Sequence, residues 1–82
     1  MKLSPVEVEW IDSCSYSGWE DAAEKVAVAK PTTCRSVGYL IRRDASALVL
    51  VQSADLDDVH GDRYADALAI PAKMVVRVRR LK

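Results

Sequence analysis

The chain has 82 residues, of which 50% are hydrophobic and 29% are charged. This length allows one hydrophobic core and this composition excludes intrinsic disorder, so we expect a single domain over residues 1–82. Twelve basic and twelve acidic side chains cancel, which excludes a global field that would draw the chain to nucleic acid or to a membrane.

No apolar run approaches the roughly 20 residues of a membrane-spanning helix, and the first residues carry no secretory signal pattern. We therefore expect a soluble, cytoplasmic protein. In that reducing compartment Cys14 and Cys34 are expected to be buried free thiols rather than a disulfide.

The N-terminal part predicts one strand and a short insertion. Apolar and acidic side chains alternate over residues 6–10 (VEVEW), the period of a strand with one buried face. The Ser- and Gly-containing segment 12–18 breaks that pattern. Residues 20–29 are rich in Ala, Glu and Lys and predict a helical turn or two, which Pro31 ends.

The C-terminal part predicts four more strands. Residues 34–43 and 47–51 are strand-like runs separated by a short polar turn, and they predict a hairpin. An acidic loop then leads to a strand over residues 64–70, and a turn at Pro71 leads to the last strand over residues 74–81. The predicted class is all-β, with a short helical or loop insertion after the first strand.

Gly38 marks a special position in the second of these strands. Val37 and Tyr39 alternate with Gly38 and Leu40, so both faces are predicted to be partly buried. A glycine inside such a run predicts a sharp bend or a close approach of another backbone, as in strands that curl into small barrels.

Two segments carry a resemblance to a known family: SVGYLIRRDASALVLVQS (residues 36–53) and ALAIPAKMVVRVRRL (residues 67–81). Their bent, glycine-bearing second strand, paired third strand and tight turn before a closing strand resemble the Sm-like small β-barrels. Together with VEVEWIDS (residues 6–13) and Gly18-Trp19, they are similar to uncharacterised small proteins of bacteriophages and prophage-bearing bacteria. The resemblance implies a five-stranded Sm-like (SH3-type) barrel.

The chain departs from the Sm-like pattern at two places. Arg43-Asp44-Ala45 stands where the family has an Asp and Asn pair, and Ala69-Ile70-Pro71 replaces its glycine-bearing signature before the last strand. The resemblance in fold and ring assembly therefore does not extend to the residues of the family's uridine-rich RNA pocket.

Catalytic and metal sites are not expected. His60 is the only histidine and lies among three aspartates, but no nucleophile motif accompanies it, so the chain is predicted to be no enzyme. Cys14, Cys34 and His60 lack the close spacing of zinc ligands. We predict no catalytic residue, no metal site and no cofactor.

Aromatic side chains suggest one kind of ligand contact. Tyr16 and Trp19 lie in a predicted loop beside Gly18, where they could stack on nucleic-acid bases. Trp10 and Tyr39 lie on apolar strand faces and are predicted to be core residues.

Basic side chains are concentrated near the C-terminal end and suggest a second kind of ligand contact. Lys73, Arg77, Arg79 and Arg80 are the candidate residues for a nucleic-acid or nucleotide contact, with Arg77 and Arg79 on one face of the strand and Arg80 and Lys82 on the other. The alternative interpretation is that these basic side chains form a solvent-exposed strand face and bind no ligand. In a ring of copies this charge would repeat around an axis and form a surface that one copy lacks.

Self-association follows from the size of the domain and its predicted edges. A domain this small buries only about 60% of its unfolded surface, and residues 6–11 and 47–51 are predicted to be unprotected edge strands that pair between copies. The first hypothesis is a non-enzymatic homo-oligomer that binds RNA or a nucleotide at subunit junctions. The alternatives are a structural or adaptor module for protein partners, and a phage protein that sequesters a small nucleotide defence signal.

Overall fold

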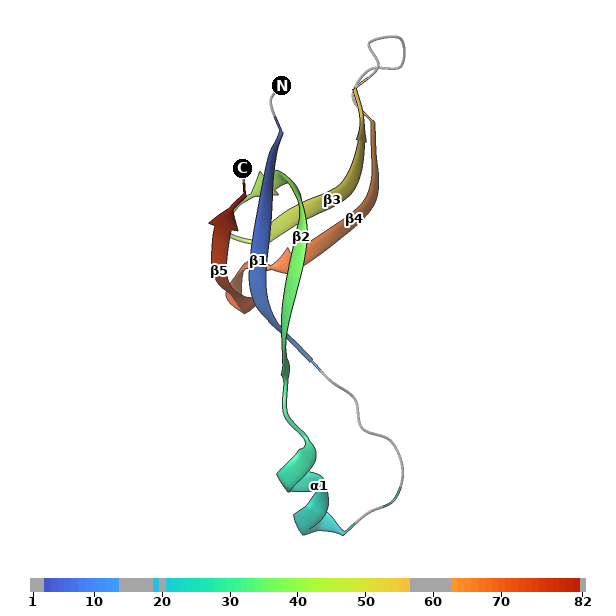
Figure 1. Cartoon of the computed structure of the whole chain (residues 1–82). Helices are drawn as coiled ribbons and strands as arrows, with labels where there is room; N and C mark the ends of the chain where they lie inside the picture. The colour runs from blue at the N-terminus through green and yellow to red at the C-terminus, as the bar shows by residue number, and fades with distance from the viewer. Residues whose placement is uncertain (1–2, 14–18, 20, 57–62, 82) are drawn as a thin grey trace.

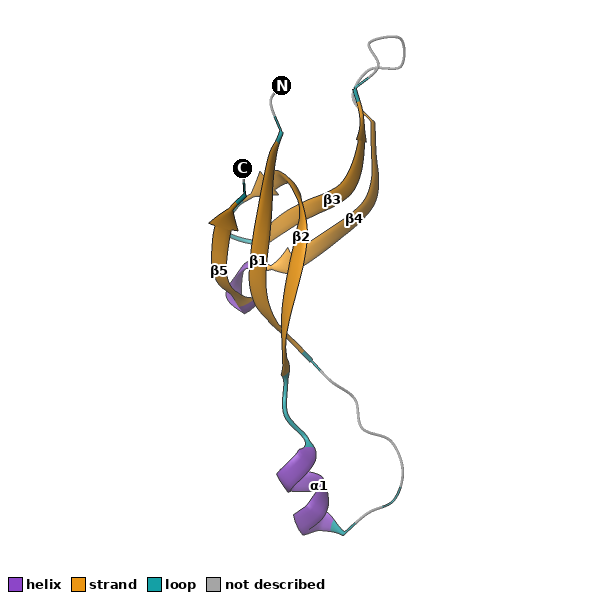
Figure 2. Cartoon of the chain, viewed as in Figure 1, coloured by secondary structure: helices purple, strands orange, loops and turns teal. Residues whose placement is uncertain are grey.

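The computed structural model describes residues 3–13, 19, 21–56 and 63–81. Five strands dominate it, and the only α-helix among these residues follows the first strand (Figure 1, Figure 2). This confirms the all-β class and the helical insertion. The elements are β1 (Ser4–Asp12), α1 (Ala22–Val28), β2 (Thr32–Arg43), β3 (Ala47–Asp55), β4 (Arg63–Pro71), the 3-10 turn η1 (Ala72–Met74) and β5 (Val75–Arg80).

The strands form one antiparallel sheet in the order β4-β3-β2-β1-β5. No ladder joins β4 to β5 within the described residues, so the sheet is not closed. The prediction of edge strands at residues 6–11 and 47–51 is wrong, because β1 lies between β2 and β5 and β3 lies between β2 and β4. The uncharged sequence of residues 47–51 reflects the position of β3 inside the sheet, between two other strands, rather than an unprotected edge.

The hydrophobic core lies on one face of the curled sheet. Its fully buried members come from β1, β3 and β4: Val6, Val8, Leu48, Leu50 and Ile70. Trp10, Leu40, Val75 and Val78 pack against this cluster. The prediction that Trp10 is a core residue is confirmed.

The alternation of β2 puts Tyr39 on the opposite face. Gly38 and Leu40 face the core side, opposite Val6 and Ser4 of β1, whereas Val37 and Tyr39 are 51% and 37% exposed. The core position predicted for Tyr39 is therefore wrong. The alternation of the strand indicates which residues share a face, but not which of two apolar faces is covered.

Gly38 lies in β2, directly before the point where this strand begins to pair with β3 as well as with β1. A Cβ atom at this position would stand 2.8 Å from the carbonyl oxygen of Val51 and 3.2 Å from the Cβ of Leu50. β2 pairs with β1 along Thr32–Leu40 but with β3 only from Tyr39 onward. The close backbone approach predicted from this glycine is confirmed.

Asp44 organises the turn between β2 and β3. Its Oδ1 accepts hydrogen bonds from the backbone N–H groups of Ser46 (2.9 Å) and Ala47 (3.0 Å), and Nε of Arg42 donates to its Oδ2 at 2.6 Å. The Arg42 hydrogen bond, followed by the two backbone donors, holds the pKa of the Asp44 carboxyl well below its usual range.

This carboxyl group predicts an acid-sensitive contribution to stability. Because its pKa is lower in the folded chain, the contribution is present above the unfolded value of 3.8 and is lost progressively as the pH falls below it. Asp44→Asn keeps an oxygen acceptor but does not titrate. Thermal unfolding at neutral pH and near pH 2 should show a larger acid-induced loss of melting temperature for the wild type than for Asp44→Asn. Equal losses would contradict this role.

The isolated chain is elongated. Its radius of gyration is 16.9 Å, against about 12 Å for a compact domain of this length, and its principal extents are 58 × 23 × 23 Å. The β1–β2 ladder continues to the Asp12–Thr32 pair, and α1 lies beyond that end of the ribbon (Figure 1). The protein therefore exposes more solvent-accessible surface than a compact domain of the same length does.

Candidate binding surfaces

The basic strand β5 is neutralised by its neighbour β1. Nη2 of Arg79 lies 3.4 Å from Oε2 of Glu7, and Nη2 of Arg77 lies 3.9 Å from Oε2 of Glu9. Nη2 of Arg35 on β2 approaches Oε1 of Glu9 at 3.4 Å from the other side. These ion pairs span β2, β1 and β5 on the face away from the core, and they favour the solvated-face interpretation of Arg77 and Arg79 over phosphate binding.

The other predicted basic contacts lie elsewhere. Arg80 is in register with Val6 and so belongs to the opposite face from Arg79, which pairs with Glu7, and Lys73 lies in η1. Both side chains are exposed, and neither has a hydrogen bond or ion pair to another described residue. The structure thus brings Arg77 and Arg79 together and separates Arg80 and Lys73 from them.

Of the two aromatic candidates, the structure describes only Trp19. Trp19 is fully exposed, at 103% of its reference area, in the connection before α1. Tyr16 lies outside the described residues, as do Cys14, His60 and Lys82. Cys34 on β2 is a free thiol, as predicted, but it is partly exposed rather than buried. Within the described part of the chain, no three His, Cys, Asp or Glu side chains gather in a way that could hold a metal ion.

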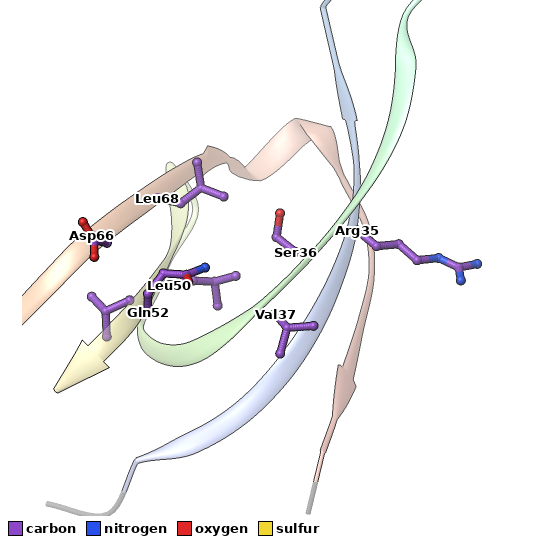
Figure 3. A pocket seen from close by; sticks show the side chains of 8 residues that line it. Arg35, Ser36, Val37, Leu50, Gln52, Asp66 and Leu68 are labelled. Carbon is purple, nitrogen blue, oxygen red and sulfur yellow. The ribbon is translucent and has the colours of Figure 1, made fainter.

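A pocket of about 500 Å³ opens between β2 and the β3–β4 hairpin (Figure 3). It exists because β2 pairs with β3 only from Tyr39 onward, so the earlier part of β2 diverges from β3. Its lining comes from three strands: Arg35, Ser36 and Val37 of β2, Leu50, Val51 and Gln52 of β3, and Asp66 and Leu68 of β4.

The polar groups of this pocket have distinct orientations. Nε1 of Trp10 donates to Oγ of Ser36 at 3.0 Å, which anchors Ser36 at the pocket wall. The Arg35 side chain extends away from the pocket in Figure 3, consistent with its ion pair to Glu9. Asp66 has a backbone φ of 60°, the only positive φ among the described residues other than glycine.

Sequence reasoning missed this pocket. The run from Arg63 to Pro71 carries ordinary strand alternation, and nothing in it marks Asp66 as a residue with left-handed backbone. The pocket is made by segments that are distant in sequence and meet only through the sheet. No local pattern could have signalled it.

No helix of the described residues has both the length and the apolar character needed to cross a membrane. No protein-family model, curated protein or solved structure matches the chain.

Proposed function

We propose that the chain is a non-enzymatic, self-associating binding protein in which the β5 edge of one copy pairs with the β4 edge of the next. The observation that carries this is its open sheet, on a chain with a large exposed surface. The chain exposes 6414 Å², about 1500 Å² more than the roughly 4900 Å² of a compact 9.1 kDa monomer. This surface includes the ribbon that carries α1 beyond the sheet (Figure 1) as well as the open sheet edges, and only the edges are proposed to pair head-to-tail with another copy.

The two open edges suit such a contact. β4 and β5 each pair with one strand only, so their outer edges present unpaired backbone N–H and C=O groups. Exposed side chains with hydrophobic surface accompany them, with Tyr64 on β4 36% exposed and Val76 on β5 55% exposed. Both edges belong to the same sheet at opposite ends, which allows each copy to use both.

An Sm-like (SH3-type) small barrel is part of this proposal. The helical insertion after β1, the shared pairing of β2 with both neighbours around Gly38 and the tight η1 turn before β5 support it. In a ring the open sheet of each copy would be continued by its neighbour.

A second candidate is the binding of RNA or a nucleotide at the junctions between copies. Lys73 and Arg80 favour it, because both are exposed cations without an ion pair to another described residue. Purified protein with a raised ratio of absorbance at 260 nm to that at 280 nm would support this candidate, and mass spectrometry would distinguish RNA from a nucleotide. Purified protein that carries neither RNA nor a nucleotide would instead favour the alternative of an adaptor module for protein partners.

Val76→Lys tests the proposed edge. A lysine on an exposed edge strand opposes pairing with another copy, so we expect the dissociation constant for self-association to rise at least tenfold. The matched control is Val26→Lys on α1, where the side chain is 79% exposed but lies off the sheet. Sedimentation at several concentrations measures both. Dissociation by the α1 variant alone would contradict pairing through β5.

A further inference from the structure

We infer that the pocket between β2 and the β3–β4 hairpin binds a small amine, with the ammonium group at Asp66 and an apolar body against Leu68. The volume of about 500 Å³ falls in the range of small-molecule sites. The site lies within one copy, so the inference does not depend on self-association.

The charges around the pocket select the head group. Among the lining residues only Arg35 and Asp66 are charged, and the guanidinium of Arg35 extends away toward Glu9, with its Nη2 3.4 Å from Oε1. The carboxylate of Asp66 is left as the charge at the pocket. A cation is favoured there, and an anion such as phosphate is not.

Hydrogen-bonding capacity points the same way. The carboxylate of Asp66 only accepts, whereas the side-chain amide of Gln52 can accept through its oxygen or donate through its NH₂ group and so suits either kind of ligand. Oγ of Ser36 already accepts the indole N–H of Trp10. A protonated amine brings three N–H donors and forms charge-assisted hydrogen bonds with a carboxylate.

The backbone at Asp66 is the second observation. Its φ of 60° lies in the left-handed region, which Asp and Asn adopt more readily than other residues with a side chain but less easily than glycine does. The pairs Val51–Ala67 and Ser53–Ala65 flank this position, which itself is absent from the ladder. A carboxylate held in a strained conformation at a pocket wall fits a ligand-binding role better than a role in the stability of the strand.

Three probes with one phenyl body test the inference: phenethylamine, phenethyl alcohol and phenylacetate. Each is titrated at neutral pH into ¹⁵N-labelled protein, and the NMR signals of Gln52, Asp66 and the Trp10 indole N–H are followed. We expect phenethylamine to saturate these shifts at a concentration at least tenfold below that of the alcohol, and phenylacetate to produce none. Failure of phenethylamine to saturate, equal binding of all three probes, or preference for phenylacetate would each overturn the inference.

Variants separate the charge of Asp66 from its structural role. Asp66→Asn keeps the size and tolerates a positive φ, so the fold should persist while phenethylamine binds at least tenfold more weakly. Glu24→Gln removes one negative charge on α1 and should leave the affinity unchanged. Asp66→Gly should melt no lower than the wild type and also lose the amine. Wild-type affinity in Asp66→Asn would show that the carboxylate does not select the ligand.

Discussion

Gly38→Val is expected to lower the free energy of unfolding by about 1 to 3 kcal/mol. The reason is the backbone carbonyl of Val51, whose oxygen would lie 2.8 Å from an added Cβ, closer than real side chains approach. The Cβ of Leu50, 3.2 Å from the same added atom, leaves no room for it on a second side. Neither neighbour can swing away, because one is main chain and the other is a core residue that is 2% exposed.

A graded pair of substitutions makes this test specific. Gly38→Ala adds only the clashing carbon and should show part of the effect, whereas Ala69→Val adds two methyl groups at an exposed position of β4 and should change stability by less than about 0.5 kcal/mol. Thermal unfolding measures all three, since about 1 kcal/mol corresponds to roughly 4–8 °C in a domain of this size. An unchanged melting temperature for Gly38→Val would show that β2 can move away from β3 at this point.

Leu48→Ala is expected to destabilise the fold by about 2 to 5 kcal/mol. Leu48 is 1% exposed, lies opposite Ile70 of β4 in the ladder and belongs to the buried cluster. Truncation loses the transfer free energy of the removed groups and leaves a cavity that strands joined on both sides cannot easily collapse. Because a domain of this size has only some 5–15 kcal/mol in total, a large fraction of its stability depends on this side chain.

The control for this variant uses the same chemistry at an exposed site. Leu56 is 64% exposed beyond the end of β3, so Leu56→Ala should change the free energy of unfolding by less than about 0.5 kcal/mol. Urea unfolding followed by circular dichroism compares the two. Equal effects of the two substitutions would contradict the core described above.

Local patterns predict the strands well because each strand carries its own signal. Alternation over residues 6–10 predicts β1, and two aliphatic runs around a polar turn predict the β2–β3 hairpin. Gly38 stands out because a glycine inside an apolar strand weakens it unless a bend or a close backbone contact requires the missing side chain. These features are encoded within a few residues and do not depend on the order of strands in the sheet.

The order of the strands determines the features that local patterns miss. Pairing of β5 with β1 brings Arg79 to Glu7 across 72 positions of sequence, so a predicted phosphate-binding residue is the partner of a carboxylate. The same long-range pairing places β1 and β3 inside the sheet. The pocket at Asp66 depends on where β2 leaves β3, which no single segment specifies.

Static light scattering of the wild type, coupled to size-exclusion chromatography at micromolar concentration and moderate salt, tests the central claim of self-association most directly. The two open edges predict a molar mass that is an integer multiple of 9.1 kDa, with more than one copy per particle. Concentration dependence of that mass would reflect exchange between free and paired edges. A mass of 9.1 kDa at every concentration would contradict the account, because the open edges and exposed apolar side chains would then be stable in water without a partner.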